Sequence, residues 1–300
     1  MKTSAHLLQP APSRPAFLFL ASLSLVLLAV TVWPLAGRAQ DGTPQPSPRI
    51  QEGRGEFEMV LIHGLGSDKQ VWDGVAPYLQ GTFKVARFEL GGHGQTPPMA
   101  DPTIEKEAAR LEAFIREQGF AYPTLVGHGM GGMIALQYAI NHPADVHRLI
   151  MIDAGPKQLA TTKQKEQVAK ALLTDYDYFV AARYSAMSPK PDVTEQIVDR
   201  ALRTDQRSFT SLLMSSFDFD VTDRLHSLTV PLLVIGSELL FPTAESSRGV
   251  LEQIGYGKAR ALSFKRIGRT GHYVMLERPV YSASVLLAFG VTAEHVFELE

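Results

Sequence analysis

The stretch of sequence that decides the fold reads TLVGHGMGGM and spans residues 124–133. Its first three residues predict a very short strand, and the apolar run 130–141 predicts a helix. Gly127, Gly131 and Gly132 remove side chains where the backbones of such a strand and helix would crowd each other. The stretch therefore predicts a strand that turns sharply into a helix.

The same alternation of strand and helix continues on both sides of this turn. Stretch 103–118 has its apolar residues on one face and Gly119 beyond its end, which predicts an amphipathic helix. Near-continuous apolar strands that alternate with helices indicate a parallel sheet covered on both faces. The fold class is therefore α/β, with a mostly parallel sheet of about six strands. The predicted strands are 57–62, 84–90, 124–126, 146–152, 230–235 and 262–267, and two further helices are predicted at 70–79 and 278–289.

Residues 156–224 interrupt the alternation. Four stretches in this region have helical patterns, and no strand pattern lies among them. We therefore expect an all-helical insertion between two strands of the sheet. Its many aromatic residues can pack it onto the sheet or line an apolar pocket beneath a lid. The four predicted helices are 163–173, 176–187, 193–203 and 208–217.

Composition excludes several classes of protein. The chain has 300 residues, with 29 Lys and Arg against 31 Asp and Glu and 45% hydrophobic residues. Disorder needs lower hydrophobicity and higher net charge, and nucleic-acid binding favours a basic surplus. The chain has no cysteine, so disulfides, thiolate nucleophiles and cysteine-based metal sites are excluded.

The first 39 residues are typical of a targeting segment. An apolar stretch at 16–33 follows two basic residues, and Gly37 and Ala39 supply the small residues of a signal-peptidase site. The stretch is also long enough to remain as an N-terminal anchor. Either alternative predicts export to the periplasm or the medium. Residues 40–55, rich in Pro, Gly, Ser and Gln, are expected to be a flexible linker.

Four motifs, in their order along the chain, resemble those of the α/β-hydrolase superfamily, in its form with a helical cap. GHGMGG at 127–132 is similar to the nucleophile elbow, whose pattern is G-x-S-x-G. HGLG at 63–66 resembles the oxyanion loop, GGHG at 91–94 the G-H-G turn, and GHYVMLERP at 271–279 the histidine loop. The resemblance implies a core of residues 56–155 and 225–300 and a helical cap of residues 156–224.

The resemblance assigns the elbow nucleophile to Gly129, which has no side chain. A covalent acyl-enzyme cannot form there, although glycine adopts the strained elbow geometry without a Cβ clash. His272 matches the catalytic base. The backbone N–H groups of Leu65 and Met130 match the oxyanion-hole donors, which need no side chain.

The carboxylate that would orient His272 is open between two residues. The resemblance predicts an acid after strand 230–235, but Leu239 occupies the matching position. Glu238 could serve with a shift of one residue. Asp153, after strand 146–152, is the other candidate.

The sequence therefore predicts an exported α/β-hydrolase-family protein whose scaffold suits hydrolysis of a small ester or acyl substrate, with weak or no activity because Gly129 lacks a nucleophile. The alternative is a non-catalytic protein that binds a small molecule. The expected partner is a small apolar or ester-type molecule, with no nucleic acid, and with membrane contact only through residues 16–33 if they are retained. No cofactor or metal is implied.

Overall fold

The structure is a computed structural model that describes residues 51–292. The expected export segment 1–39 and most of the expected linker 40–55 lie outside these described residues. Within residues 51–292, no helix combines the length and the apolar character needed to cross a membrane.

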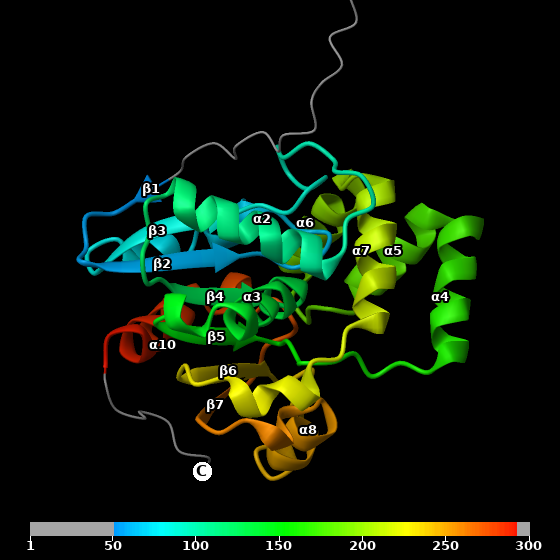
Figure 1. The fold of residues 1–300 in the computed structure, drawn as a ribbon. Coiled ribbons are helices and arrows are strands. Elements are labelled where there is room, and N and C mark those ends of the chain that lie inside the picture. The colour runs from blue at the N-terminus through cyan, green and yellow to red at the C-terminus, as the bar shows by residue number, and fades with distance from the viewer. Residues whose placement is uncertain (1–50, 293–300) are drawn as a thin grey trace, which may run out of the picture. The chain divides into compact units, whose positions relative to one another are not determined.

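The described residues contain one seven-stranded sheet, in the order β1-β3-β2-β4-β5-β6-β7 (Figure 1). Strands β2 to β7 pair in parallel, and β1 pairs antiparallel with β3. The strands are β1 (Gln51–Glu52), β2 (Phe57–Ile62), β3 (Phe83–Phe88), β4 (Thr124–His128), β5 (Arg148–Ile152), β6 (Leu232–Ser237) and β7 (Leu262–Ile267).

The central strands β4, β5 and β6 are buried at every position, which explains why they are mostly apolar. On β5, Leu149 and Met151 join one apolar cluster, whereas Ile150 and Ile152 join the cluster on the opposite face. Successive side chains of a strand point to opposite faces, so a strand buried on both sides cannot alternate with polar residues. The prediction of a parallel α/β sheet is confirmed.

The sheet has one strand more than the six predicted. Gln51 and Glu52 form β1, opposite Ala86 and Val85 of β3. These two residues fall in the range expected to be a flexible linker, so that expectation is wrong for them. A strand of two polar residues has no hydrophobic periodicity, so the sequence pattern could not predict it. β1 is held by a contact between residues distant in the sequence, because Glu52 forms an ion pair with Arg87 of β3 at 2.9 Å.

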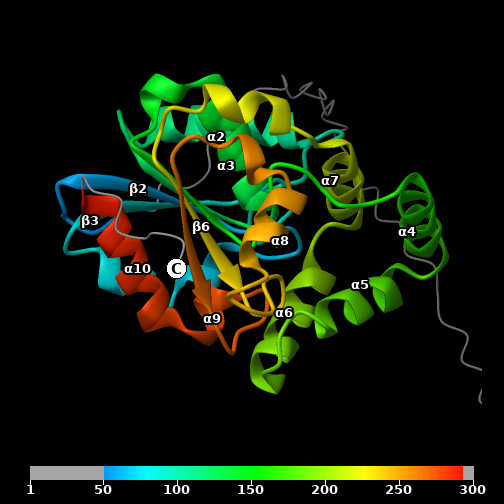
Figure 2. The same ribbon diagram turned by 90° about the horizontal axis from the view of Figure 1, so that it is seen from below.

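Helices cover the two faces of the sheet (Figure 2). Helices α2, α3 and α8 contribute to one apolar cluster, and α1, α9 and α10 contribute to the other. These helices are α1 (Ala76–Leu79), α2 (Ile104–Glu117), α3 (Met130–Asn141), α8 (Ser247–Gln253), α9 (Val274–Glu277) and α10 (Pro279–Val291). Short 3₁₀ turns lie at Lys69–Trp72, Pro143–Asp145, Thr222–Ser227 and Tyr256–Lys258.

Local chemistry sets where these helices begin and end. Thr103 caps α2, because its side chain accepts a hydrogen bond from the backbone N–H of Lys106. The helix expected at 70–79 is divided into a 3₁₀ turn and the short α1. Pro77 lies in the first turn of α1, where its missing N–H costs nothing, but a continuous helix would need that donor.

Four helices follow one another between β5 and β6, in the range expected to be helical. We call them the helical segment: α4 (Thr162–Thr174), α5 (Tyr176–Ser185), α6 (Pro191–Arg203) and α7 (Gln206–Asp218). Thr161, Asp175 and Asp205 cap three of them by accepting backbone N–H groups. Figure 1 shows the segment beyond the carboxyl ends of the parallel strands. This is the edge of the sheet where the loops that carry function are expected in α/β folds.

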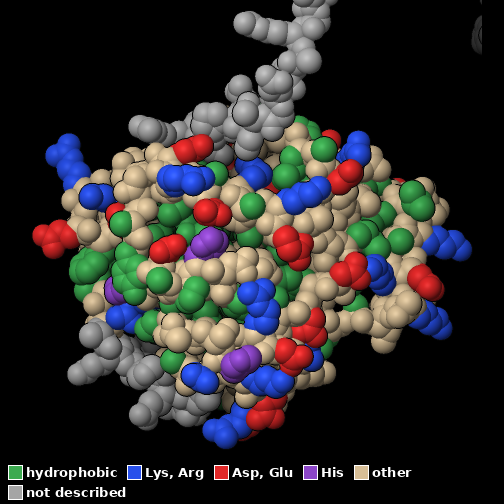
Figure 3. All heavy atoms as spheres, viewed as in Figure 1, with side chains coloured by type: hydrophobic (Ala, Val, Ile, Leu, Met, Phe, Trp, Pro, Cys, Tyr) green, Lys and Arg blue, Asp and Glu red, His purple; other side chains and the backbone are tan. Residues whose placement is uncertain are grey.

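Charged side chains of both signs are interspersed on the face shown in Figure 3. Neither sign forms a continuous patch there. That face therefore has no continuous positive patch of the kind that binds a polyanion.

Candidate functional site

The strand-to-helix turn forms where the sequence predicted it. Gly129 lies between β4 and α3, with φ 52° and ψ −118°. L-amino acids with a side chain rarely adopt this backbone conformation, whereas glycine reaches it without strain. The close approach on either side of the turn also requires glycine. A Cβ on Gly131 would lie 2.5 Å from the carbonyl oxygens of His63 and Ile62.

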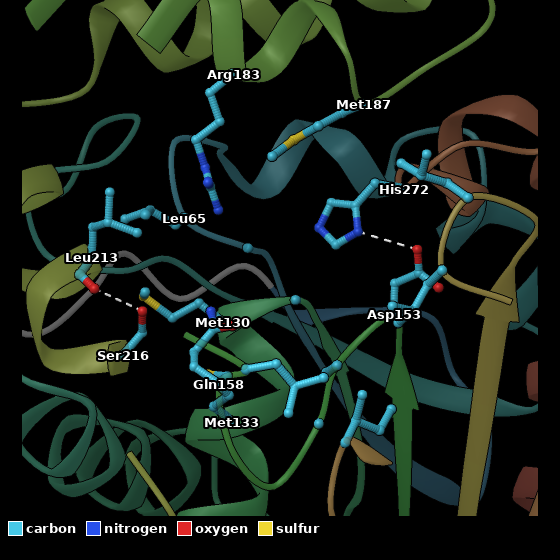
Figure 4. Close-up of a pocket in the computed structure, with 18 of the residues that line it drawn as sticks. Leu65, Met130, Met133, Asp153, Gln158, Arg183, Met187, Leu213, Ser216 and His272 are labelled. Atoms are coloured by element: carbon cyan, nitrogen blue, oxygen red, sulfur yellow. Dashed lines mark hydrogen bonds and ion pairs between the residues drawn. The ribbon is translucent and has the colours of Figure 1, made fainter. Parts of the chain in front are cut away.

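His272 and Asp153 meet beside this turn (Figure 4). The imidazole Nδ1 of His272 lies 3.1 Å from Oδ2 of Asp153, whose side chain is fully buried. The backbone N–H of Ser237 donates to Asp153 Oδ1 at 2.6 Å, and the Ser237 hydroxyl donates to Oδ2. The buried carboxylate is thus satisfied on both oxygens. Its geometry fixes the imidazole with Nδ1 as the donor and Nε2 turned away from Asp153.

Glu238, the first candidate for the carboxylate that orients His272, pairs with other groups instead. Its carboxylate accepts hydrogen bonds from the backbone N–H of Arg269 at 2.9 Å and from the Arg266 guanidinium at 3.0 Å. The Arg269 hydrogen bond, followed by Arg266, lowers the pKa of Glu238. The structure therefore pairs His272 with Asp153, and Glu238 forms a surface ion pair. Sequence reasoning did not single out Ser237, although it is the serine that ends β6 immediately before Glu238.

The Nε2 atom of His272 faces Gly129. A Cβ built on Gly129 would lie 3.2 Å from Nε2 and 4.0 Å from the Cα of Gly64. This point is within hydrogen-bonding reach of the imidazole for any hydroxyl that such a side chain carried. An imidazole held by a buried carboxylate therefore faces the residue that follows β4, and that residue, Gly129, has no side chain.

Two backbone donors border the same space. Leu65 and Met130 both line the cavity described below, and no hydrogen bond from either N–H is found in residues 51–292. Met130 is the first residue of α3, where a helix has unpaired N–H groups and the positive end of its dipole. Both N–H groups are therefore available to a ligand oxygen that carries negative charge.

A pair of buried histidines holds the loop that carries Leu65. His93 Nε2 accepts the N–H of Gly66 at 3.1 Å, and His63 Nε2 accepts the N–H of Leu90 at 3.1 Å. The Nδ1 atoms of the two rings lie 2.8–2.9 Å from backbone carbonyl oxygens. Each ring thus donates through Nδ1 and accepts through Nε2, which requires the neutral form. Burial lowers the pKa of His63 to about 4 and that of His93 to about 3.

A cavity of about 340 Å³ opens above these groups. Its floor includes Gly129, Met130 and His272, and the helical segment contributes Arg183, Tyr184, Leu213 and Ser216 (Figure 4). The Tyr184 hydroxyl donates to the carbonyl of Leu65 at 2.5 Å, which joins α5 to the loop below it. A volume of this size suits a small ligand.

No three histidine or carboxylate side chains in residues 51–292 are grouped as a metal site would require.

The sheet, the turn at Gly129 and the His272–Asp153 pair together define an α/β-hydrolase scaffold. The chain belongs to the alpha/beta hydrolase family, whose model matches residues 59–284.

Relatives with known names include both enzymes and a receptor. The chain is 36% identical to pimeloyl-[acyl-carrier protein] methyl ester esterase of Methylococcus capsulatus over 130 residues, which cover 43% of this chain and 49% of that protein. It is 30% identical to lipase LipV of Mycobacterium tuberculosis over 132 residues, which cover 44% and 49%. It is 26% identical to karrikin insensitive 2 receptor B of Petunia hybrida over 62% of this chain and 74% of that protein. The chain spans about half the length of the two bacterial relatives.

Solved structures show the same fold. The enol-lactonase of Burkholderia xenovorans LB400 matches with a TM-score of 0.70 at 20% identity, over 80% of this chain and 95% of that one. A thermophilic esterase of Thermogutta terrifontis matches with a TM-score of 0.71 at 22% identity, over 80% and 91%.

The buried histidines predict a stability that falls in mild acid. In the folded chain the pKa values of His63 and His93 lie below their usual value of about 6.5, so the unfolded chain binds more protons below that pH. As the pH falls from about 6 toward the folded-state pKa, each such histidine lowers the free energy of unfolding by about 1.4 kcal/mol per pH unit. We expect His93→Gln to make this slope shallower in urea unfolding between about pH 5 and 6.5. His226→Gln, at an exposed histidine, is the matched control, and equal slopes for the two variants would contradict the assignment.

Proposed function

We propose that this protein carries the apparatus of a serine-type acyl hydrolase, complete except for the nucleophile side chain. One observation carries the proposal. His272 Nε2 lies 3.2 Å from the point where a Cβ on Gly129 would be, while its Nδ1 contacts the buried Asp153. The relatives that are named esterase and lipase support the same chemistry.

A hydroxyl at position 129 would complete the reaction. Its oxygen would attack the carbonyl carbon of an ester and pass its proton to His272 Nε2. Asp153 would stabilise the resulting imidazolium, and the N–H groups of Leu65 and Met130 would bind the oxyanion. The imidazolium would protonate the leaving alcohol. Water activated by His272 would then release the acid and restore the hydroxyl.

With Gly129 in place, the first step has no protein nucleophile. His272 then has only water to deprotonate, and the oxyanion donors still act on the ester carbonyl. Oxyanion and binding effects alone leave roughly 10³–10⁴-fold acceleration over water in hydrolases that lack triad members. We therefore propose weak or no ester hydrolysis by the chain as it stands.

A second candidate is a protein that binds a small molecule without turnover. The observation in its favour is that the cavity of about 340 Å³ persists above a residue that cannot react. A relative named as a receptor, 26% identical to this chain, also supports this candidate. The two candidates share the cavity and differ only in whether its contents react.

We further propose export, which rests on the apolar stretch 16–33 and the small residues Gly37 and Ala39. Cleavage after Ala39 predicts Gln40 as the first residue of the exported protein. N-terminal sequencing of the exported fraction tests this. An intact N-terminus in the membrane fraction would favour the anchor, and an intact N-terminus in the cytosol would contradict export.

Gly129→Ser is expected to create esterase activity. The side chain must accept φ 52°, which costs about 1–3 kcal/mol of stability. His272 must also move by a few tenths of an ångström. We expect hydrolysis of p-nitrophenyl butyrate to rise by roughly 10²-fold or more over the unmodified protein. Gly129→Ala is the matched control, because it adds the same Cβ and strain without a hydroxyl. Equal rates for the two variants would contradict the proposal.

The carboxylate assignment is tested in the Gly129→Ser background. Asp153→Asn should lower kcat by roughly 10⁴-fold, because an amide no longer stabilises the imidazolium or selects its tautomer. Glu238→Gln removes an exposed carboxylate and should change kcat by no more than about twofold. Melting temperatures separate loss of folding from loss of chemistry. The reverse ranking of the two folded variants would assign the role to Glu238.

A further inference from the structure

Arg183 lies in the wall of the cavity and has no polar partner among residues 51–292. It lies near the end of α5, and Figure 4 shows its side chain pointing into the cavity. Its side chain is half-buried, and within residues 51–292 it forms no hydrogen bond or ion pair. The neighbouring Tyr184 is buried and bonded to the carbonyl of Leu65, so the backbone that carries Arg183 is fixed above the oxyanion donors.

The other charges of the cavity do not neutralise Arg183. Asp153 is the one carboxylate among the lining residues, and its oxygens are already bound to His272 and Ser237. Lys157 also lines the cavity and forms no ion pair within the described residues. The unpaired charge of the wall is therefore positive, and the free backbone donors of Leu65 and Met130 add to it.

Most of the remaining wall is apolar. Met130, Met133, Met187, Leu213 and Leu240 line the space between the polar groups. A half-buried guanidinium in apolar surroundings has lost part of its hydration, and a ligand carboxylate would replace it with two charge-assisted hydrogen bonds. A neutral alkyl ester would leave this guanidinium unpaired.

We propose that the cavity selects acyl compounds that carry a second, ionised carboxylate, such as monoesters of short dicarboxylic acids. Arg183 binds the free carboxylate, with Lys157 adding attraction. The ester carbonyl lies at the N–H groups of Leu65 and Met130, and the methylene chain lies along the methionines and leucines. The position of the carbonyl rests on the proposed function, whereas recognition of the carboxylate rests on Arg183, with Lys157 nearby.

Binding to the unmodified protein tests the carboxylate without requiring catalysis. Calorimetry would compare monomethyl glutarate with methyl butyrate, its neutral counterpart, and would extend to the monomethyl esters of succinic and adipic acids. We expect a preference for the acidic esters and a loss of roughly tenfold to a hundredfold in Arg183→Gln, the scale of a charge-assisted pair. Arg183→Lys, which keeps the charge, should retain part of the affinity.

Arg203→Gln is the matched control, because it removes an arginine of the helical segment whose side chain is 67% exposed and paired with Asp199. It should bind as the unmodified protein does. Equal affinity of the acidic and neutral esters overturns the proposal, as do equal losses in Arg183→Gln and Arg203→Gln. Failure of every acidic ester to bind also overturns it, provided that melting temperatures show folded protein.

Turnover in the Gly129→Ser background separates this proposal from the proposed function. The mono-p-nitrophenyl ester of glutaric acid should have a higher kcat/KM than p-nitrophenyl butyrate, and Arg183→Gln should remove the preference through KM. Hydrolysis of both esters at equal kcat/KM would overturn the carboxylate proposal and leave the function standing. If the Gly129→Ser protein is inert but still binds the acidic ester through Arg183, the proposed function is overturned and the carboxylate proposal stands.

Discussion

The site depends on how closely α3 approaches the strands at the turn after β4. Gly131 lies where an added Cβ would be 2.5 Å from two carbonyl oxygens of β2 and the residue after it, so only glycine permits the contact. At this approach Gly129 has a positive φ of 52°, and Met130, the first residue of α3, lines the cavity. The carboxyl end of β5 lies beside that of β4 and places Asp153 against His272, and the end of β6 places Ser237 against Asp153.

The geometry of the turn therefore does not depend on a side chain at position 129. An elbow residue with a side chain is held in a conformation that costs on the order of 1–3 kcal/mol, and glycine avoids this cost. The N–H groups proposed to bind an oxyanion belong to the backbone, and the His272–Asp153 contact does not involve residue 129. The contacts of Asp153 with His272 and with Ser237 involve no group of residue 129. Under the proposed function, the scaffold and its cavity therefore do not depend on a hydroxyl at this position.

Much of the fold followed from hydrophobic pattern, because a sheet buried on both faces leaves a strong signal. Helix α3 has the predicted bounds, Met130–Asn141, and the turn at Gly129 follows from its glycines. The acid partner of His272 could not be chosen in this way. Asp153 and Glu238 both follow parallel strands that are neighbours in the sheet, and the direction of each side chain depends on loop geometry, such as φ 45° at Asp153. The position of Arg183 in the cavity wall could not be predicted, because the sequence around a half-buried arginine on a helix looks the same as around a solvated one.

The most direct test of the central claim is covalent labelling with a fluorophosphonate, followed by mass spectrometry of the peptides. The reagent reacts with a hydroxyl only where a base and oxyanion donors activate it. For Gly129→Ser we expect a single adduct, at position 129, and for the unmodified protein we expect none. An unlabelled but folded Gly129→Ser protein, or an adduct on a serine elsewhere in the chain, would contradict the claim that only the nucleophile is missing.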